Sequence, residues 1–230
     1  MAIKAILFDL DDTLLDTNMD QFIPKYLDAL GFKMRHLMDP KQLIDLVLES
    51  TYMMIENQDP KLTNEEVFYN HFYPRTEFSR TEFQPLIEEF YDMDFPKLKI
   101  YTNSIPHVVN SVKAIYDKGY KIVVATNPLF PAKAIYHRID WAGLSKIDFN
   151  LITTYENSHF CKPNPYYYIE IIEKLEVKPD EAIMIGDDYK NDIIPAESIG
   201  MQTYYINSNS ETGKSGSLRE CFEWIEAGFK

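Results

Sequence analysis

The stretch that decides the fold is Ile3-Lys4-Ala5-Ile6-Leu7-Phe8-Asp9-Leu10-Asp11-Asp12-Thr13, near the start of a chain of 230 residues. Its first six residues form a short, mostly apolar run, which is typical of a strand buried in a sheet. Acids follow at once, so this strand delivers polar groups to one edge of the sheet. Four further runs of the same kind predict strands at residues 121–126, 149–153, 182–185 and 202–206.

Helical patterns separate these strands. Residues 106–118 end before Gly119, a residue suited to a helix C-terminus, and Asn164-Pro165 supplies an N-cap and a first-turn proline for a helix running to residue 176. Apolar residues at helical spacing predict a last helix around residues 218–225. Alternating strands and helices predict an α/β fold, a Rossmann-like three-layer core with a mostly parallel five-stranded sheet.

One interval is too long for a simple connection. Residues 16–96 separate the first strand from the next unit, whereas a crossover helix needs only about a dozen residues. Because the apolar spacing within this interval is helical, we expect a small all-helical second domain there, with residues 1–15 and 97–230 forming the core. The polar segment 207–217, rich in Gly and Ser, predicts a surface loop.

Composition and charge limit the function classes. The 36 acids exceed the 23 Lys and Arg residues and give a net charge of −13, which disfavours nucleic acids and anionic membrane surfaces as partners. The only cysteines, Cys161 and Cys221, have no metal-ligand spacing and are expected to be free thiols of a reducing compartment. No apolar run reaches about 18 residues. We therefore expect a cytoplasmic protein that is not exported.

Polar residues fall at the ends of the predicted strands: Asp9 and Asp11 after the first, Thr126-Asn127 after the second, Lys162 in a loop after the third and Asp187 after the fourth. In open parallel sheets, ligands bind outside the carboxyl ends of the strands, so these side chains are candidates to meet. Convergence of the three acids would require a cation, and an all-oxygen ligand set suits Mg²⁺. A carboxylate, Mg²⁺, a lysine and a hydroxyl together indicate phosphoryl transfer.

The order of these motifs resembles that of the haloacid dehalogenase-like superfamily. Asp9-Leu10-Asp11-Asp12-Thr13 matches the DxDxT signature of its first motif, and Thr126 is similar to its second motif, a Thr or Ser at the end of an apolar strand. Lys162 corresponds to the third motif, and Gly186-Asp187 with Asp192 to the fourth, GDxxxxD. A single match would be weak, whereas four in order are specific.

The resemblance implies a role for each matching residue. Asp9 would be the nucleophile that forms an aspartyl-phosphate, and Asp11 would protonate the leaving oxygen and then activate water. Thr126 would hold a phosphate oxygen, and Lys162 would stabilise the charge shared by Asp9 and the phosphoryl group. The Asp9 side chain, the Asp11 backbone carbonyl and Asp187 would bind Mg²⁺.

Expectations for Asp192 and the insertion come from the same resemblance, and those for Asp188 and Asn127 come from helix capping and turn preference. Asp192 would support the site from behind the ligands, and Asp188 is expected to cap a helix. Asn127 is expected either to contact the substrate or only to form a turn. The long helical insertion would be a cap that closes over the substrate. Cys161 stands where many members of the superfamily have Gly before the lysine, which removes no needed group.

The expected protein is therefore a Mg²⁺-dependent phosphatase acting on a small phosphorylated metabolite, with no oligomeric state predicted. Two alternatives stay open: a phosphomutase of the same superfamily and, from a different class, a receiver-like phosphoaspartate signalling module. A dehalogenase is disfavoured, because dehalogenating members carry a non-acidic residue at the position of Asp11.

Overall fold

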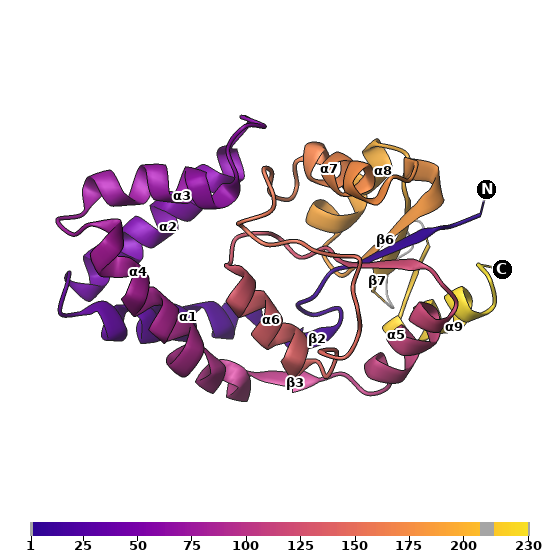
Figure 1. Ribbon diagram of the computed structural model, residues 1–230. Helices are drawn as coiled ribbons and strands as arrows, with labels where there is room; N and C mark the ends of the chain where they lie inside the picture. The colour runs from indigo at the N-terminus through magenta and orange to yellow at the C-terminus, as the bar shows by residue number, and fades with distance from the viewer. Residues whose placement is uncertain (1, 208–213, 230) are drawn as a thin grey trace.

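A six-stranded parallel sheet forms the centre of the larger part of the molecule. The computed structural model describes residues 2–207 and 214–229, and its strands follow the order β5-β4-β1-β6-β7-β8 (Figure 1). Their bounds are β1 Ala5–Phe8, β4 Lys121–Val124, β5 Leu151–Ile152, β6 Ala182–Gly186, β7 Gln202–Ile206 and β8 Ser215–Gly216. Because β1 lies between β4 and β6, the sheet has its topological switch point beside the first strand.

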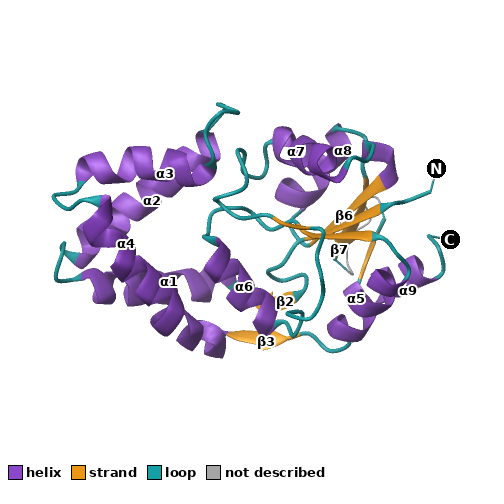
Figure 2. Cartoon of the chain, in the orientation of Figure 1, coloured by secondary structure: helices purple, strands orange, loops and turns teal. Residues whose placement is uncertain are grey.

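Helices cover both faces of the sheet (Figure 2). Side chains alternate along a strand, so Leu7 lies on one face of the sheet and Ile6 on the other. The first face is covered by α7 (Pro165–Leu175) and α8 (Ile194–Ser198), and the second by α5 (Val108–Asp117) and α9 (Leu218–Glu226). The predicted three-layer α/β fold is thus confirmed.

The predicted number of strands was one too few. The chain pairs β8 with β7 inside the segment expected to be only a loop, residues 207–217. A strand of two residues, Ser215 and Gly216, carries no hydrophobic alternation, which explains why the pattern missed it. Residues 208–213 of the predicted loop lie outside the described residues.

Helix boundaries agree closely with the sequence signals. Helix α7 begins at Pro165, and the side chain of Asn164 accepts a hydrogen bond from the backbone N–H of Tyr166, as expected of an N-cap. Helix α5 ends at Asp117, and Gly119 follows with a φ of +84°, a conformation that glycine adopts without a steric penalty.

The long insertion is helical. It contains α1 (Met19–Met34), α2 (Pro40–Glu56), α3 (Asn64–Phe72) and α4 (Arg80–Glu89), followed by a π-helical turn, Phe90–Asp94, and a 3₁₀ segment, Phe95–Tyr101. In Figure 1 these helices gather on one side of the molecule, away from the sheet. Their buried faces are rich in aromatic residues, since Phe72, Phe83 and Phe90 all belong to the core.

A two-stranded antiparallel ribbon joins the helical segment to the sheet. Strand β2 (Leu15–Thr17) leaves the sheet region and pairs with the returning strand β3 (Thr102–Ser104). The boundaries predicted at residues 15–16 and 96–97 fall in β2 and in the 3₁₀ segment before β3. Both crossing strands have only three residues, too few to show a periodic pattern.

Helix α6 (Ala132–Trp141) lies between the sheet and the helical segment (Figure 1). It is the only α-helix in the described residues between Thr126 and Lys162, as expected, and β5 is the only strand there. Within the described chain, none of the helices combines the length and apolar character needed to cross a membrane. Both cysteines are free and buried.

Candidate functional site

The polar residues at the carboxyl ends of β1, β4 and β6 line one cavity of about 320 Å³. The first strand contributes Asp9 and Asp11, the loop after β4 contributes Thr126, and the loop after β6 contributes Asp187. The remaining predicted site residues line the same cavity: Asn127, Lys162 and Asp192. Every site residue named from the sequence is therefore brought together, although as many as 183 positions separate Asp9 from Asp192.

Lys162 lies between two carboxylates at the floor of this cavity. Its Nζ donates to Oδ1 of Asp9 and to Oδ1 of Asp192, both at 2.6 Å. The side chains of Lys162 and Asp192 are each only 2% exposed. Charge-assisted hydrogen bonds of this length are strong, so the ammonium group fixes the position of the Asp9 carboxylate.

The floor of the cavity carries excess negative charge. Burial raises the pKa of Asp9 well above its ordinary value; the ammonium of Lys162 opposes this shift, and the Asp192 and Asp11 carboxylates add to it. Burial also raises the pKa of Asp192, with Lys162 again opposing. For Lys162, burial favours the neutral form, but Asp192 and Asp9 outweigh it and raise its pKa well above the usual value. The single ammonium group of Lys162 is thus paired with two buried carboxylates.

Asp187 adds a further carboxylate to this group. Burial, followed by the negative charges of Asp192 and Asp12, raises the pKa of Asp187 to about 6, against a hydrogen bond from Thr13. The Thr13 hydroxyl donates to Oδ1 of Asp187 at 3.2 Å. Such a shift means that the ionised form of Asp187 lacks sufficient positive charge nearby.

Carboxylate oxygens of Asp9, Asp187 and Asp192 lie within 4.8 Å of one another, a spacing at which one metal ion could be held. The all-oxygen donor set and the uncompensated negative charge both fit a hard divalent cation such as Mg²⁺. The predicted ligands were the side chains of Asp9 and Asp187 and the backbone carbonyl of Asp11. The group of carboxylates in the structure contains Asp192 in place of Asp11. Both oxygens of Asp192 have partners, since Oδ1 accepts from Lys162 and Oδ2 from the backbone N–H of Asp188, and its role behind the metal ligands stays a prediction.

Close packing around Gly186 positions Asp192. A side chain at Gly186 would begin 2.1 Å from Oδ2 of Asp192, so only glycine allows this approach. The same Oδ2 accepts the backbone N–H of Asp188 at 3.1 Å. Asp188 itself caps the turn Tyr189–Ile193, since its side chain accepts the backbone N–H groups of Lys190 and Asn191. The expectation that Asp188 caps a helix is thereby confirmed.

Hydrogen bonds at Thr126 and at Asn127 fix the position of the loop after β4. The backbone carbonyl of Thr126 accepts hydrogen bonds from the hydroxyls of Thr153 and Tyr167, at 2.7 and 2.9 Å. Asn127 accepts the backbone N–H of Lys162 through its Oδ1 at 3.1 Å. Asn127 therefore connects two motifs of the site, and its contact with a substrate stays a prediction.

Sequence reasoning missed Arg138, which belongs to α6. Its Nη1 donates to Oδ2 of Asp11 at 2.5 Å, and its side chain is only 1% exposed. The guanidinium also lies 4.6 Å from the ring centre of Phe130. Among the described residues, Nε and Nη2 of Arg138 and Oδ1 of Asp11 have no hydrogen-bond partner although they are buried.

A signal for Arg138 was present in the sequence. The buried residues of α6 include Ala134 and Ile135, and Arg138 occupies the same apolar face four and three positions after them. An arginine on such a face requires a buried acidic partner. Its position thus anticipates an ion pair, although no helical pattern identifies Asp11, 127 positions earlier, as the partner.

Comparison with known proteins identifies the family of the chain. The family model described as haloacid dehalogenase-like hydrolase matches residues 3–200. Pyrophosphatase PpaX of Bacillus cereus is 25% identical over 209 residues, covering 90% of this chain and 84% of the relative. Phosphoglycolate phosphatase of Vibrio vulnificus is 25% identical over 224 residues, covering 95% and 90%.

A solved structure shares the fold. The crystal structure of a HAD phosphatase from Thermococcus onnurineus superposes with a TM-score of 0.56 at 23% identity, covering 97% of this chain and 98% of the other. The matched residues 3–200 include every strand whose carboxyl end bears a site residue and the whole helical insertion. With the family model spanning most of its length, the chain belongs to the haloacid dehalogenase-like hydrolases, as the order of its motifs predicted.

Proposed function

We propose that this hydrolase is a Mg²⁺-dependent phosphatase that cleaves a small phosphorylated metabolite through an aspartyl-phosphate at Asp9. The observation that carries the proposal is the Lys162 ammonium, which binds Asp9 and Asp192 at 2.6 Å beside Asp187. A carboxylate fixed by a lysine in a group of acids is suited to attack phosphorus while positive charge offsets the phosphoryl oxygens.

In the first step, an Asp9 oxygen attacks phosphorus, and the bond from phosphorus to the leaving oxygen breaks. Lys162 opposes the effect of burial on the pKa of Asp9 and holds its carboxylate in place through Oδ1. Asp11 gives its proton to the leaving oxygen, so an alcohol departs and Asp9 carries the phosphoryl group. The proton would be carried by Oδ1 of Asp11, which has no hydrogen-bond partner among the described residues, because Oδ2 accepts from Arg138.

In the second step, Asp11 accepts a proton from water as the water oxygen attacks phosphorus. The bond from the Asp9 oxygen to phosphorus breaks, inorganic phosphate leaves, and Asp11 is protonated again. Thr126, at the rigid end of β4, would hold a phosphate oxygen throughout. The loop from Thr126 to Asn127 positions the motif of Lys162 through the Asn127 contact.

Mg²⁺ would be held by the side chains of Asp9 and Asp187 with the backbone carbonyl of Asp11, and when bound it supplies positive charge that offsets the phosphoryl oxygens. Asp192 would orient Lys162 and so act behind the ligands. The raised pKa of Asp187 supports this assignment, because its causes are burial and then the nearby carboxylates of Asp192 and Asp12, and a bound cation would favour the ionised form against both.

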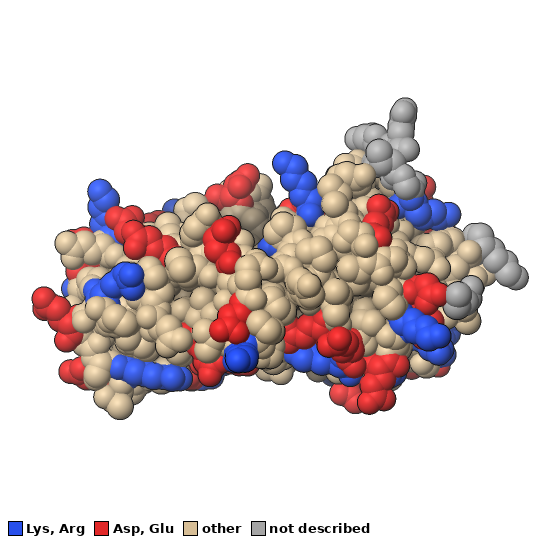
Figure 3. Space-filling view, turned by 90° about the horizontal axis from the view of Figure 1, so that it is seen from above, with Lys and Arg blue, Asp and Glu red and all other residues tan. Residues whose placement is uncertain are grey.

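The helical segment, residues 16–96, would act as a cap over the cavity and exclude water from the reaction. Relatives named for pyrophosphate and phosphoglycolate support a small phosphorylated substrate. On the face that Figure 3 shows, Lys and Arg are scattered among Asp and Glu and form no single basic patch, in keeping with a small-molecule substrate instead of nucleic acid. We place the enzyme in the cytoplasm on the basis of its two free cysteines.

The test is a screen of phosphate esters with Mg²⁺, comparing wild type with Asp9→Asn. We expect Asp9→Asn to lose phosphate release while keeping its fold. The matched control is Asp188→Asn, which removes a carboxylate from the same group of acids but keeps a capping oxygen. Equal phosphate release by Asp9→Asn and wild type would refute the proposal.

Product analysis separates the remaining alternative. A phosphomutase would pass the phosphoryl group from Asp9 to a second hydroxyl of a sugar phosphate and take back the group at the first position, so an isomeric sugar monophosphate and not free phosphate would accumulate. The membership in a hydrolase family weighs against the receiver-like module, which would hold its phosphoryl group without turnover.

A further inference from the structure

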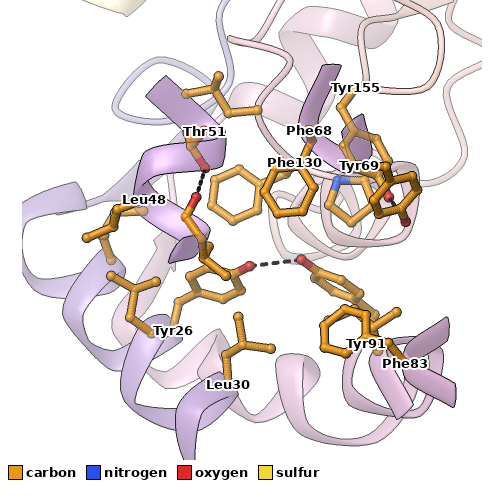
Figure 4. A pocket seen from close by; sticks show the side chains of 16 residues that line it. Tyr26, Leu30, Leu48, Thr51, Phe68, Tyr69, Phe83, Tyr91, Phe130 and Tyr155 are labelled. Atoms are coloured by element: carbon orange, nitrogen blue, oxygen red, sulfur yellow. Dashed lines mark hydrogen bonds between the residues drawn. The ribbon is translucent and has the colours of Figure 1, made fainter. Parts of the chain in front are cut away.

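A second cavity, of about 210 Å³, lies between the helical segment and two loops of the core. Its walls come from α1 to α4, from Tyr91, from the loop at residues 129–131 and from Tyr155 (Figure 4). Folded proteins are packed nearly as densely as organic crystals, so a void of this size is far larger than an ordinary packing defect. For comparison, an apolar cavity of about 150 Å³ binds benzene.

The cavity offers a ligand almost nothing but carbon. None of the described residues that line it is charged. The hydroxyls of Tyr26 and Tyr91 bind each other at 2.9 Å, and Figure 4 shows them directed at one another. The hydroxyls of Tyr69 and Tyr155 form a second pair at 3.0 Å, and Thr51 donates to a backbone carbonyl of its own helix.

These internal hydrogen bonds decide the kind of occupant. A sugar or a nucleobase would bury hydroxyls or ring nitrogens against carbon, at a cost of about 1–3 kcal/mol for each unsatisfied group. An alkyl chain or an aromatic ring loses no hydrogen bonds there. The chemistry of the walls thus selects an apolar group.

The apolar cavity shares a wall with the acidic cavity. Leu129 and Phe130 line both. The ring of Phe130 lies 5.2 Å from that of Tyr26, in the apolar cavity, and 4.6 Å from the guanidinium of Arg138, in the acidic one. The same loop carries Thr126, only three residues before Leu129, so the two cavities are adjacent.

We propose that the apolar cavity binds the leaving group of the substrate, and that the enzyme therefore prefers phosphate monoesters of apolar alcohols, either alkyl or aromatic. This inference rests on the proposed phosphatase function. The phosphate would lie against Asp9, and the carbon chain would pass Phe130 into the helical segment. By the ratio of volume to carbon atoms in the benzene cavity, about eight carbons would fill the space.

The experiment measures kcat/KM for ethyl, butyl, hexyl and octyl phosphate, with glycerol phosphate as the polar control, all below micelle-forming concentrations. We expect kcat/KM to rise about three- to fourfold per methylene, and so by about 700- to 4,000-fold over the six methylenes from ethyl to octyl phosphate. Leu27→Trp fills the cavity from α1, and Leu48→Trp fills it from α2. Both variants should abolish the rise.

Met53→Trp is the matched control, since Met53 is exposed on α2 and does not line the cavity. It should keep the full dependence on chain length. The inference would be overturned if kcat/KM of wild type did not depend on chain length. It would also be overturned if Leu27→Trp and Leu48→Trp kept this dependence while circular dichroism showed both variants to be folded.

Binding measurements separate this inference from the proposed function. Calorimetric titration of Asp9→Asn protein with octyl phosphate and with glycerol phosphate requires no turnover. Tighter binding of octyl phosphate that Leu27→Trp removes supports the apolar site even if Asp9 proved not to be the nucleophile. Conversely, hydrolysis of every ester that depends on Asp9 but not on the alcohol would leave the phosphatase function standing and refute the apolar site.

Discussion

Replacing Arg138 by Met tests whether the buried ion pair with Asp11 is structural. Methionine keeps the unbranched apolar stem but removes the guanidinium that binds Oδ2 of Asp11 at 2.5 Å and contacts the ring of Phe130. The Asp11 carboxylate would then stay inside the cavity without its cation. The substitution therefore converts a paired buried charge into an unpaired one.

The magnitude follows from the burial of the two partners. Removing one partner of a fully buried pair costs about 3–5 kcal/mol. Arg138 is 1% exposed, but the Asp11 side chain is 12% exposed and can be partly hydrated, so we take the lower end, about 3 kcal/mol. For a chain of this size that corresponds to a decrease in Tm of about 6–12 °C.

Thermal and urea unfolding of a double-mutant cycle provide the measurement. The variants are Arg138→Met, Asp11→Asn and the two combined, with Arg138→Lys as the variant that keeps the charge. If the ion pair stabilises the fold as the structure indicates, the combined variant will be less destabilised than the sum of the single variants. Strict additivity, or an Arg138→Met protein as stable as wild type, would refute the reasoning.

Two further predictions concern the acidic group. Gly186→Ala should lower both stability and kcat, because its methyl group would displace Asp192 and with it Lys162. The control Gly119→Ala has no neighbour within 4 Å, so it should cost only about 1 kcal/mol of stability and leave kcat unchanged. Equal effects of the two variants in unfolding and phosphate-release assays would contradict the crowding at Gly186. Because the pKa of Asp187 is raised to about 6, the metal-free protein should lose stability as pH rises between about 4 and 6. For the same reason, Mg²⁺ affinity measured by calorimetry should be about tenfold weaker at pH 5 than at pH 7.5. Affinity that does not change with pH, or that changes equally in Asp187→Asn, would argue against this carboxylate as a ligand.

The sequence predicted the sheet well because strands in parallel sheets are buried on both faces and appear as apolar runs. Strand β7 has the predicted bounds, 202–206, and the strand pattern at residues 3–8 contains all of β1. The strands β2, β3 and β8 have only two or three residues and mixed polarity, so no periodicity indicates them. Strands β2 and β3 form by pairing with each other across the whole helical insertion, and β8 forms by pairing with β7, and a local pattern contains neither contact.

The site residues could be predicted because the carboxyl ends of parallel strands meet at one edge. Their mutual contacts could not. The ion pairs of Lys162 with Asp9 and Asp192 and of Arg138 with Asp11 join residues 30 to 153 positions apart. The apolar cavity depends on how four helices pack against the loop containing Phe130, which the helical spacing of the aromatic residues did not reveal.

The most direct test of the account is whether Asp9 carries the phosphoryl group during turnover. Wild-type enzyme is mixed with Mg²⁺ and a phosphate ester that it cleaves, quenched in acid within one turnover and digested for mass spectrometry. We predict a single phosphoryl group on Asp9, absent when Asp9→Asn is treated in the same way. A phosphoryl group on another residue, or phosphate release by Asp9→Asn at the wild-type rate, would contradict the mechanism.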